Sequence, residues 1–219
     1  MSIRAQSVLF DLDGTLVDTA PDLVAALNKV LVAHGRPALS VEQGRPYVSR
    51  GAMGLLYRGF GLQTDHPEYP VYVEELLGHY RSALSVQSVL FGGMEAVLAR
   101  LEADERVWGV VTNKAANLTE PLLKEMGLSE RLAVLVCGDT LAEKKPSPKP
   151  LLHACDLANI TPEQTIYVGD DPRDVEAANA AGMISVAVRY GYYDDSENIE
   201  DWGADIIIDH PKALLTLLN

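Results

Sequence analysis

Two aspartates separated by a single residue, Asp11 and Asp13, begin a stretch that contains Gly14 and Thr15 and ends at a third aspartate, Asp18. One carboxylate of such a pair can attack phosphorus, because aspartyl-phosphate formation is an established form of covalent catalysis. The other can protonate a leaving alcohol and later deprotonate water. Asp before Gly is also common in ordinary turns, so the pair needs partners elsewhere in the chain before it indicates an active site.

Three later apolar segments are also followed by polar residues that could act on a phosphate ester. In chain order these residues are Thr112, Asn113, Lys145, Asp170, Asp171 and Asp174. The lysine would balance negative charge on the attacking carboxylate and the phosphoryl group, and its neighbour Lys144 is the alternative for this role. The threonine hydroxyl and nearby backbone amides would donate hydrogen bonds to phosphate oxygens.

Several carboxylates in one pocket would repel one another and a phosphate dianion. A hard divalent cation removes this repulsion, and Mg²⁺ prefers oxygen ligands and commonly links carboxylates to a substrate phosphate. The histidines and the two cysteines show no metal-ligand spacing, and we expect Cys137 and Cys155 to be free thiols. The chain is therefore predicted to use Mg²⁺ as its cofactor.

These polar residues can meet only if the segments before them lie side by side. Short apolar runs predict buried strands at residues 7–10, 107–111, 133–137, 165–168, 184–188 and 206–208. Helical patterns alternate with the later strands, which predicts a parallel sheet covered on both faces, an α/β core of the doubly wound, Rossmann-like kind. Parallel strands end at the same edge of a sheet, so the polar groups would converge there.

The segment after the aspartate run has a different pattern. A helix is predicted to start at Thr19 or Ala20, and the pattern then stays helical, with glycine breaks, for more than 60 residues without a convincing strand. We therefore predict a catalytic core formed by residues 1–18 and 86–219. Residues 19–85 would form an inserted helical cap domain.

In order, these groups resemble the motifs of the haloacid dehalogenase (HAD) superfamily of phosphatases and phosphotransferases. The insert after the first motif resembles the subgroup with a small helical cap, the C1 cap. The resemblance implies that Asp11 is the nucleophile and that Asp13 is the general acid/base, whose backbone carbonyl also binds Mg²⁺. Thr112 matches the hydroxyl residue of the second motif and Lys145 the lysine of the third, which completes the predicted catalytic set.

The segment Gly-Asp-Asp-Pro-Arg-Asp, which contains Asp170, resembles the fourth motif of the superfamily. The resemblance makes Asp170 a direct magnesium ligand together with Asp11 and Asp13. Asp171 or Asp174 would support the metal, and the sequence leaves open which of the two touches it.

Within the superfamily, the chain resembles phosphoglycolate phosphatases, although Phe-Gly-Gly-Met at 91–94 stands where that group often has a Pro-Gly pair. Segments 108–114, 190–192, 202–205 and 209–211 also resemble bacterial N-acetylmuramic acid 6-phosphate phosphatases. The two kinds of enzyme share their chemistry and differ in the substrate that the cap admits. We expect a phosphomonoesterase of the phosphoglycolate phosphatase type, with the second substrate as the alternative and a small phosphorylated metabolite as the partner.

Substrate selection is expected to come from the cap. Arginine can bind a substrate carboxylate through paired hydrogen bonds, and Arg45, Arg50 and Arg58 lie in the insert. Arg50 is the best placed of the three, because Gly51 follows it at a break between helices. We predict Arg50 and Gly51 as substrate-binding residues together with Asn113. The alternative is that these arginines form a solvated helix face.

The formal net charge of −13 argues against a nucleic-acid or anionic-membrane surface. No apolar run approaches the roughly 20 residues of a membrane span, and the first residues lack the apolar region of a signal peptide. We therefore expect a cytoplasmic protein with no nucleic-acid or membrane partner. The sequence leaves monomer and homodimer open.

Three other functions stay open on the sequence. A sugar phosphomutase would use the same aspartates and return the phosphoryl group to a sugar. A haloacid dehalogenase would need no metal and would leave Asp13 and Asp170 without a role. A non-catalytic binding protein on this scaffold is disfavoured by the intact set of polar groups.

Overall fold

The centre of the molecule is a six-stranded sheet in which every strand pair is parallel and the strand order is β5-β4-β1-β6-β7-β8. The computed structural model describes residues 5–193 and 198–218. The six strands are β1 (Ser7–Phe10), β4 (Val107–Val111), β5 (Val134–Val136), β6 (Thr165–Gly169), β7 (Ile184–Val188) and β8 (Ile206–Ile208). The predicted doubly wound, parallel α/β core is confirmed.

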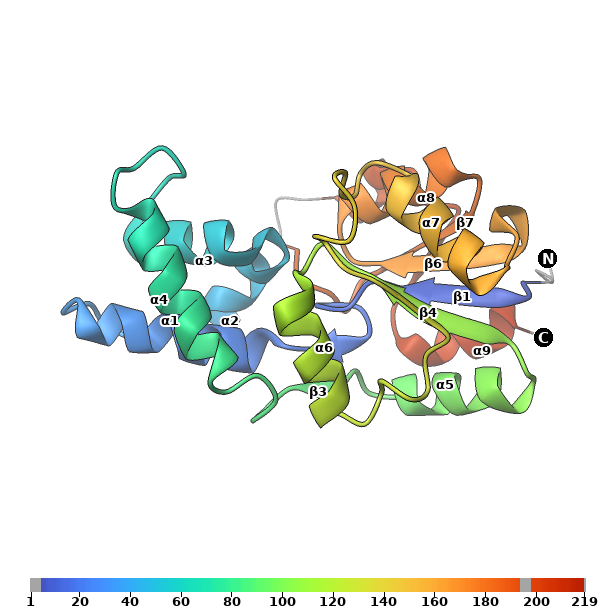
Figure 1. Cartoon of the computed structure of the whole chain (residues 1–219), viewed down its shortest axis with the longest axis horizontal. Coiled ribbons are helices and arrows are strands. Elements are labelled where there is room, and N and C mark those ends of the chain that lie inside the picture. The colour runs from blue at the N-terminus through green and yellow to red at the C-terminus, as the bar shows by residue number, and fades with distance from the viewer. Residues whose placement is uncertain (1–4, 194–197, 219) are drawn as a thin grey trace.

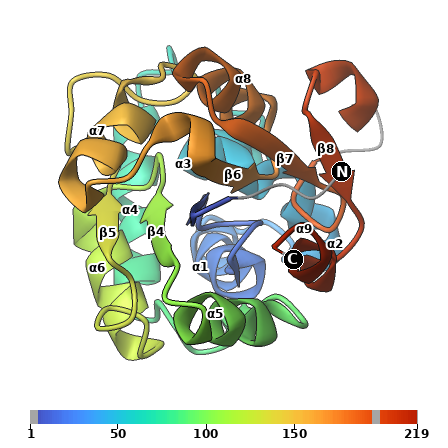
Figure 2. The same cartoon turned by 90° about the vertical axis from the view of Figure 1, so that its right-hand side faces the viewer.

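Helices cover both faces of this sheet, with α7 and α8 on one face and α5 and α9 on the other (Figure 2). The core helices are α5 (Met94–Ala103), α6 (Ala116–Glu125), α7 (Lys149–Ala158), α8 (Pro172–Ala181) and α9 (Leu214–Leu217). Side chains alternate along β1 as a strand requires. Val8 and Phe10 pack in a cluster with Leu98 of α5, whereas Leu9 packs in a cluster with Leu151 of α7. Burial on both faces explains why the strand reads as a continuous apolar run.

The position of β1 in the middle of the sheet determines where the chemistry can occur. Phe10, its last residue, pairs with Val110 of β4 on one side and with Val168 of β6 on the other. The residues that follow these three strands therefore leave the sheet next to one another, and Asp11 comes directly after Phe10.

A group of helices stands on the side of the molecule toward which the strands point (Figure 1). It contains α1 (Ala20–Ala33), α2 (Val41–Gly44), a 3₁₀ turn (Arg45–Arg50), α3 (Gly51–Phe60) and α4 (Tyr69–Arg81). Leu27, Leu55 and Leu76 are fully buried among them. We call these helices the cap, and the domain bounds given above remain a proposal.

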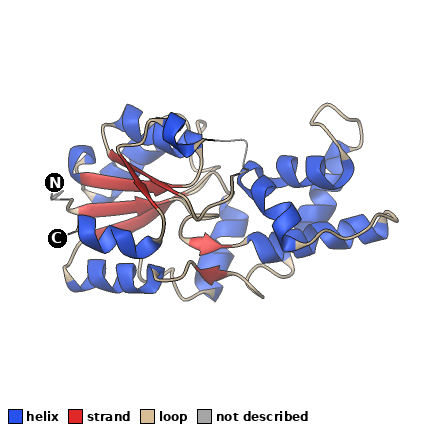
Figure 3. Cartoon of the chain, turned by 180° about the vertical axis from the view of Figure 1, so that it is seen from behind, coloured by secondary structure: helices blue, strands red, loops and turns tan. Residues whose placement is uncertain are grey.

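Two short strands, β2 (Val17–Asp18) and β3 (Val89–Leu90), join the cap to the sheet domain as an antiparallel pair between the two parts (Figure 3). The sequence analysis did not predict this pair, because two-residue strands carry no detectable period. The buried Asp22 of α1 accepts hydrogen bonds from the backbone amide of Ser88 (2.8 Å) and from its hydroxyl (2.7 Å). Both connections between the cap and the core are thus held together.

Two helix starts carry residues of the candidate site. Helix α8 begins at Pro172, three residues before the predicted Val175, because Asp171 and Asp174 form a capping box with each other's backbone amides. Helix α1 begins after Thr19, as predicted, but the Thr19 side chain makes no capping hydrogen bond. In the described part of the chain, we find no helix with the length and apolar character that crossing a membrane requires.

Candidate active site

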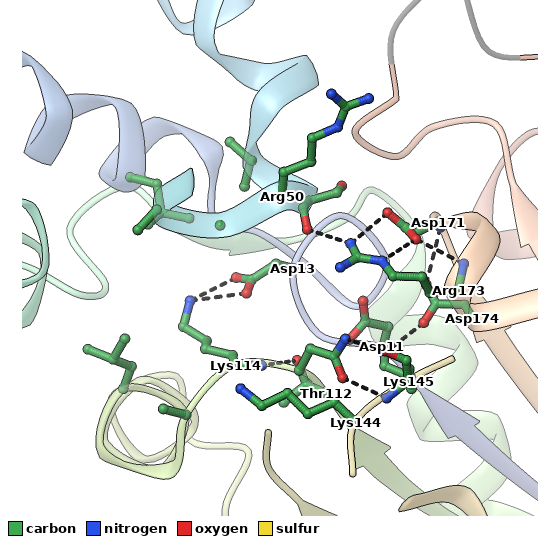
Figure 4. Close-up of a pocket in the computed structure, with 18 of the residues that line it drawn as sticks. Asp11, Asp13, Arg50, Thr112, Lys114, Lys144, Lys145, Asp171, Arg173 and Asp174 are labelled. Carbon is green, nitrogen blue, oxygen red and sulfur yellow. Dashed lines mark hydrogen bonds and ion pairs between the residues drawn. The ribbon is translucent and has the colours of Figure 1, made fainter. Parts of the chain in front are cut away.

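A cavity of about 420 Å³ lies between the ends of the strands and the cap (Figure 4). Charged and polar residues from the strand ends line one wall of the cavity. Residues from the cap line the opposite wall. The predicted residues that line it are Asp11, Asp13, Arg50, Gly51, Thr112, Asn113, Lys145, Asp171 and Asp174, together with the alternative Lys144.

Lys145 holds the first aspartate. Its side chain is 2% exposed, and its Nζ lies 2.9 Å from Asp11 Oδ1 and 2.7 Å from Asp174 Oδ1. It also donates to the hydroxyl of Tyr167 at 2.7 Å. Burial alone would lower the pKa of Lys145, but the carboxylates of Asp11 and Asp174 raise it above its ordinary value. The lysine therefore stays charged against the predicted nucleophile, whereas the alternative Lys144 is exposed.

Asp11, Asp170 and Asp174 form an acidic cluster in which one oxygen of each lies within 4.8 Å of the others. Burial first, and then the neighbouring Asp11 carboxylate, raises the pKa of Asp170 well above its ordinary value. Burial and Asp11 also raise the pKa of Asp174, to about 7, against the opposing effect of the Lys145 ammonium. The Lys145 ammonium offsets one of these negative charges, and three carboxylates held this closely are still unfavourable as anions without a further cation.

The donor set of this cluster fits Mg²⁺. Among the described residues, Asp11 Oδ1 is a buried side-chain oxygen that accepts no aligned hydrogen bond, despite the Lys145 ammonium 2.9 Å away. A buried acceptor without a hydrogen bond is costly unless another partner satisfies it. Hard oxygen ligands at a strand-end pocket are the usual surroundings of Mg²⁺ in enzymes that bind phosphate.

Asp170 is fixed by donors from three segments. Its Oδ1 accepts from the Thr15 hydroxyl at 3.0 Å, and its Oδ2 accepts from the Tyr192 backbone amide at 2.8 Å. The Ser49 hydroxyl of the cap lies 3.2 Å from the same Oδ2. Gly14 is required beside it, because a Cβ there would lie 2.1 Å from an Asp170 oxygen, and its φ is +85°.

Asp13 points to a different partner. Its Oδ1 lies 2.9 Å from the Nζ of Lys114, and it also accepts a hydrogen bond from the Thr19 hydroxyl. Lys114 in turn donates to the hydroxyl of Tyr80 in α4 at 2.8 Å. Burial alone would lower the pKa of Lys114, but Asp13 and Tyr80 raise it above its ordinary value. Lys114 was not among the site residues predicted from the sequence, although it directly follows the predicted Thr112 and Asn113.

In the segment that resembles the fourth motif, Asp171 and Asp174 have different partners. Asp171 faces Arg173, whose Nε lies 2.6 Å from Asp171 Oδ1, and it caps α8. Burial would raise the pKa of Asp171, but Arg173 lowers it. Asp174, one turn later, points into the acidic cluster. Between the two residues that the sequence left open, the structure therefore places Asp174 beside Asp170, and it pairs Asp171 with Arg173.

Thr112 and Asn113, which follow β4, also have different partners. Thr112 is buried at the cavity, and its hydroxyl oxygen accepts from the Lys114 backbone amide at 3.2 Å. The Asn113 side chain bonds to both backbone groups of Lys145, accepting from its N–H and donating to its C=O at 3.0 Å each. Asn113 therefore anchors the loop that carries Lys145, and its predicted contact with substrate stays a prediction.

The cap residues predicted from sequence are less closely tied to the cluster. Arg50 is exposed, and its guanidinium points away from Asp11 in Figure 4. Gly51 has a φ of +60° and forms the turn between the 3₁₀ segment and α3. Arg45 donates to both oxygens of Asp18 at 2.9 Å, so it supports the connection between cap and core.

Most of the remaining cap wall is apolar, with Ser49 and Tyr80 as its polar side chains. The apolar side chains come from α1, the 3₁₀ turn, α3 and α4 and are Leu23, Val48, Ala52 and Leu77. Leu118 of α6, in the core, adds to the same apolar surface. This surface can pack against uncharged parts of a leaving group, and it offers few hydrogen-bonding groups to a small acid.

The chain matches a known family and known proteins over most of its length. Residues 8–188 match the family described as haloacid dehalogenase-like hydrolase. The chain is 42% identical over 217 residues to an N-acetylmuramic acid 6-phosphate phosphatase from Pseudomonas aeruginosa, covering 99% of this chain and 96% of that protein. It is 44% identical over 209 residues to a phosphoglycolate phosphatase from Xanthomonas campestris pv. campestris, covering 95% and 94%.

A solved structure resembles the whole chain. It is the crystal structure of a predicted phosphoglycolate phosphatase from Haemophilus somnus, with a TM-score of 0.87, 27% identity and complete coverage of both chains.

Proposed function

This chain belongs to the haloacid dehalogenase-like hydrolase family and is a phosphoric monoester hydrolase, and on that premise we propose that it transfers a phosphoryl group to Asp11 and then to water. The observation that carries the proposal is the acidic cluster with its buried lysine. Asp11 stands at the end of the central strand, within 2.9 Å of the Lys145 ammonium and next to Asp170 and Asp174. This is the setting that a carboxylate nucleophile needs against a dianionic ester.

Each residue of the strand-end wall then has a definite task. Asp11 attacks phosphorus, while Lys145 offsets the charge that the transferring group brings. Thr112 donates its hydroxyl to a phosphate oxygen. Asp13 protonates the leaving oxygen and afterwards takes a proton from the water that releases phosphate. Asp13 can perform both steps because its carboxylate lines the cavity.

The carboxylates of Asp11, Asp170 and Asp174 would hold Mg²⁺, and the backbone carbonyl of Asp13 is the further ligand that the family resemblance implies. When bound, the cation neutralises the cluster and polarises the phosphoryl oxygens. Asp170 is kept in place by Thr15 and the Tyr192 amide.

The cavity favours a leaving group larger than that of phosphoglycolate. A volume of about 420 Å³ and the apolar cap wall offer contacts that a two-carbon acid cannot fill. A phosphorylated sugar with acetamido and lactyl groups has the methyl groups and the size to use them. We therefore infer that N-acetylmuramic acid 6-phosphate is the better substrate, and that phosphoglycolate is the second candidate.

Phosphate release from a panel of esters tests this proposal. Both candidates, a simple aryl phosphate and several sugar phosphates are compared by kcat/KM with Mg²⁺ present. A clear preference for N-acetylmuramic acid 6-phosphate supports the assignment, and a preference for phosphoglycolate reverses the two candidates. Formation of an isomeric sugar phosphate in place of free phosphate would point to the phosphomutase function.

A further inference from the structure

A second buried lysine lies between the cap and the strand ends. The side chain of Lys114 is 7% exposed. Its Nζ is 2.9 Å and 3.2 Å from the two oxygens of Asp13, and 2.8 Å from the hydroxyl of Tyr80. The ammonium also lies 4.5 Å from the centroid of the Tyr80 ring, where a cation is attracted to the ring face.

These three residues come from three separate elements. Asp13 follows β1, Lys114 follows β4, and Tyr80 is the last fully buried side chain of α4 in the cap. The Lys114 ammonium therefore connects a cap helix directly to the residue proposed as the general acid/base. The dashed lines between Lys114 and Asp13 in Figure 4 show the core half of this connection.

The connection has a counterpart on the other aspartate. Lys145 holds Asp11 and is enclosed by core residues, including Tyr167. Lys114 holds Asp13, and its tyrosine partner belongs to the cap. The nucleophile is thus positioned by the core alone, whereas the position of the acid/base depends on where the cap lies.

Proton transfer requires the carboxylate to stay within hydrogen-bond reach of the leaving oxygen. Asp13 is 18% exposed at its side chain and stands at a cavity wall, so its carboxylate needs a fixed partner to keep one orientation. Thr19 contacts Oδ1, and Lys114 contacts both oxygens. Of these two partners, Lys114 is the one joined to α4.

Resting on the proposed function, we propose that Lys114 is a positioning residue that holds the Asp13 carboxylate toward the leaving group, and that Tyr80 completes this arrangement when the cap is docked. Lys114 acts through Asp13, so its loss must resemble a partial loss of Asp13. A residue that served the fold alone would affect all substrates equally.

The test compares Lys114→Met with wild type in single-turnover release of the leaving group, using an aryl phosphate and an alkyl phosphate with Mg²⁺. The aryl alcohol leaves readily without protonation, and the alkyl alcohol does not. We expect Lys114→Met to slow the reaction of the alkyl ester about 10- to 100-fold, which is part of the rate enhancement of about 10²- to 10⁴-fold that general acid–base catalysis typically contributes. The reaction of the aryl ester should be slowed much less. Tyr80→Phe, which removes only the hydroxyl, should give a smaller loss of the same kind, about 2- to 10-fold.

Two further variants complete the design. Lys124→Met removes an exposed lysine of α6 and serves as the matched control. Adding Lys114→Met to Asp13→Asn should cause no further slowing, because the residue through which Lys114 acts is already gone.

Equal slowing of both esters, or the same factor in the Asp13→Asn background, would overturn the proposal. If Lys114→Met does not fold, Tyr80→Phe decides by the same comparison, and a loss that is equal for both esters or absent would count against it. Wild-type turnover with Mg²⁺ is measured first, so a failure of the proposed function is seen separately from a failure of this inference.

Discussion

The two walls of the cavity differ in how their residues are held. On the strand-end wall, Lys145 is almost completely buried and has several partners, and so does Asp170 in the acidic cluster beside this wall. On the cap wall, the exposed Arg50 faces away from the acidic cluster, and apolar side chains make up most of the surface. The first wall is built to hold charges at fixed positions. The second is built mainly to enclose a leaving group, and Tyr80 and Ser49 connect it to the charged residues of the first.

Of all changes to the two walls, replacing the nucleophile should have the largest effect on turnover. Asp11→Asn is expected to lower turnover of every ester by about 10⁴-fold or more, as loss of a catalytic nucleophile does elsewhere. The fold should persist, because the change removes one negative charge from a crowded acidic cluster. Phosphate release and circular dichroism on the purified variant measure both properties. Turnover near the wild-type rate would show that the strand-end wall does not act through Asp11.

Removal of the metal should be nearly as severe. A chelator is expected to abolish turnover of all esters, and added Mg²⁺ to restore it, because the three clustered carboxylates need a divalent cation to offset their mutual repulsion. The assay is phosphate release before and after chelation, with Mg²⁺ added back. Full phosphate release after exhaustive chelation would contradict the metal site.

The same site predicts a dependence of stability on pH. The pKa of Asp174 is raised from 3.8 to about 7, so the folded, metal-free protein keeps a proton between these values that the unfolded chain releases. Its stability should therefore fall as the pH rises through that window. Mg²⁺ binds the deprotonated cluster, so its increase of the melting temperature should be larger at about pH 8 than at about pH 5. A Mg²⁺ effect independent of pH would contradict this coupling.

A change of volume tests the cap wall. Ala52 lines the cavity from α3, and Ala52→Phe is expected to hinder a large leaving group and to spare a small one. Overpacking typically costs about 1–3 kcal/mol, which corresponds to about 5- to 150-fold in kcat/KM. The measurement compares N-acetylmuramic acid 6-phosphate with phosphoglycolate. Equal losses would mean that the change disturbs the closure of the cap and not the fit of the leaving group.

The smallest effect is expected at Arg50. The sequence pattern favours a contact with a substrate carboxylate, but an exposed ion pair is worth only about 0.2–1 kcal/mol, or about 1.4- to 5-fold. Arg50→Ala should therefore lower kcat/KM slightly for a carboxylated substrate and leave an uncharged aryl phosphate unchanged. A loss of 100-fold or more would show that Arg50 is enclosed with the substrate when the cap closes.

The order of these effects reflects what the sequence can reveal. Asp11 and Asp170 each follow a buried strand, so the apolar runs and the parallel arrangement were enough to predict that they meet. The choice between Asp171 and Asp174 was beyond the sequence, because it depends on where α8 begins. The helix starts at Pro172, and Asp171 then becomes its cap while Asp174 turns inward.

Contacts between the cap and the core also could not be predicted from the sequence. Lys114 lies next to Asn113 in a strand-end segment, and a lysine there could have been considered, but its pairing with Tyr80 joins residues from two separate parts of the chain. Ser49 and Arg173 form a similar contact, in which the guanidinium donates to the Ser49 carbonyl at 2.8 Å. Such pairs depend on how α4 and the 3₁₀ turn dock, and no local pattern encodes that.

Phosphorylation of Asp11 can be tested directly with the Asp13 variant. Asp13→Asn should slow the release of phosphate more than the attack on an aryl phosphate, so the phosphorylated protein should accumulate with Mg²⁺ present. Acid quenching, reduction of the acyl phosphate with borohydride and peptide mass spectrometry then identify the modified residue. We expect homoserine at position 11. Adduct at another residue, or an unmodified protein that still turns over the ester, would contradict it.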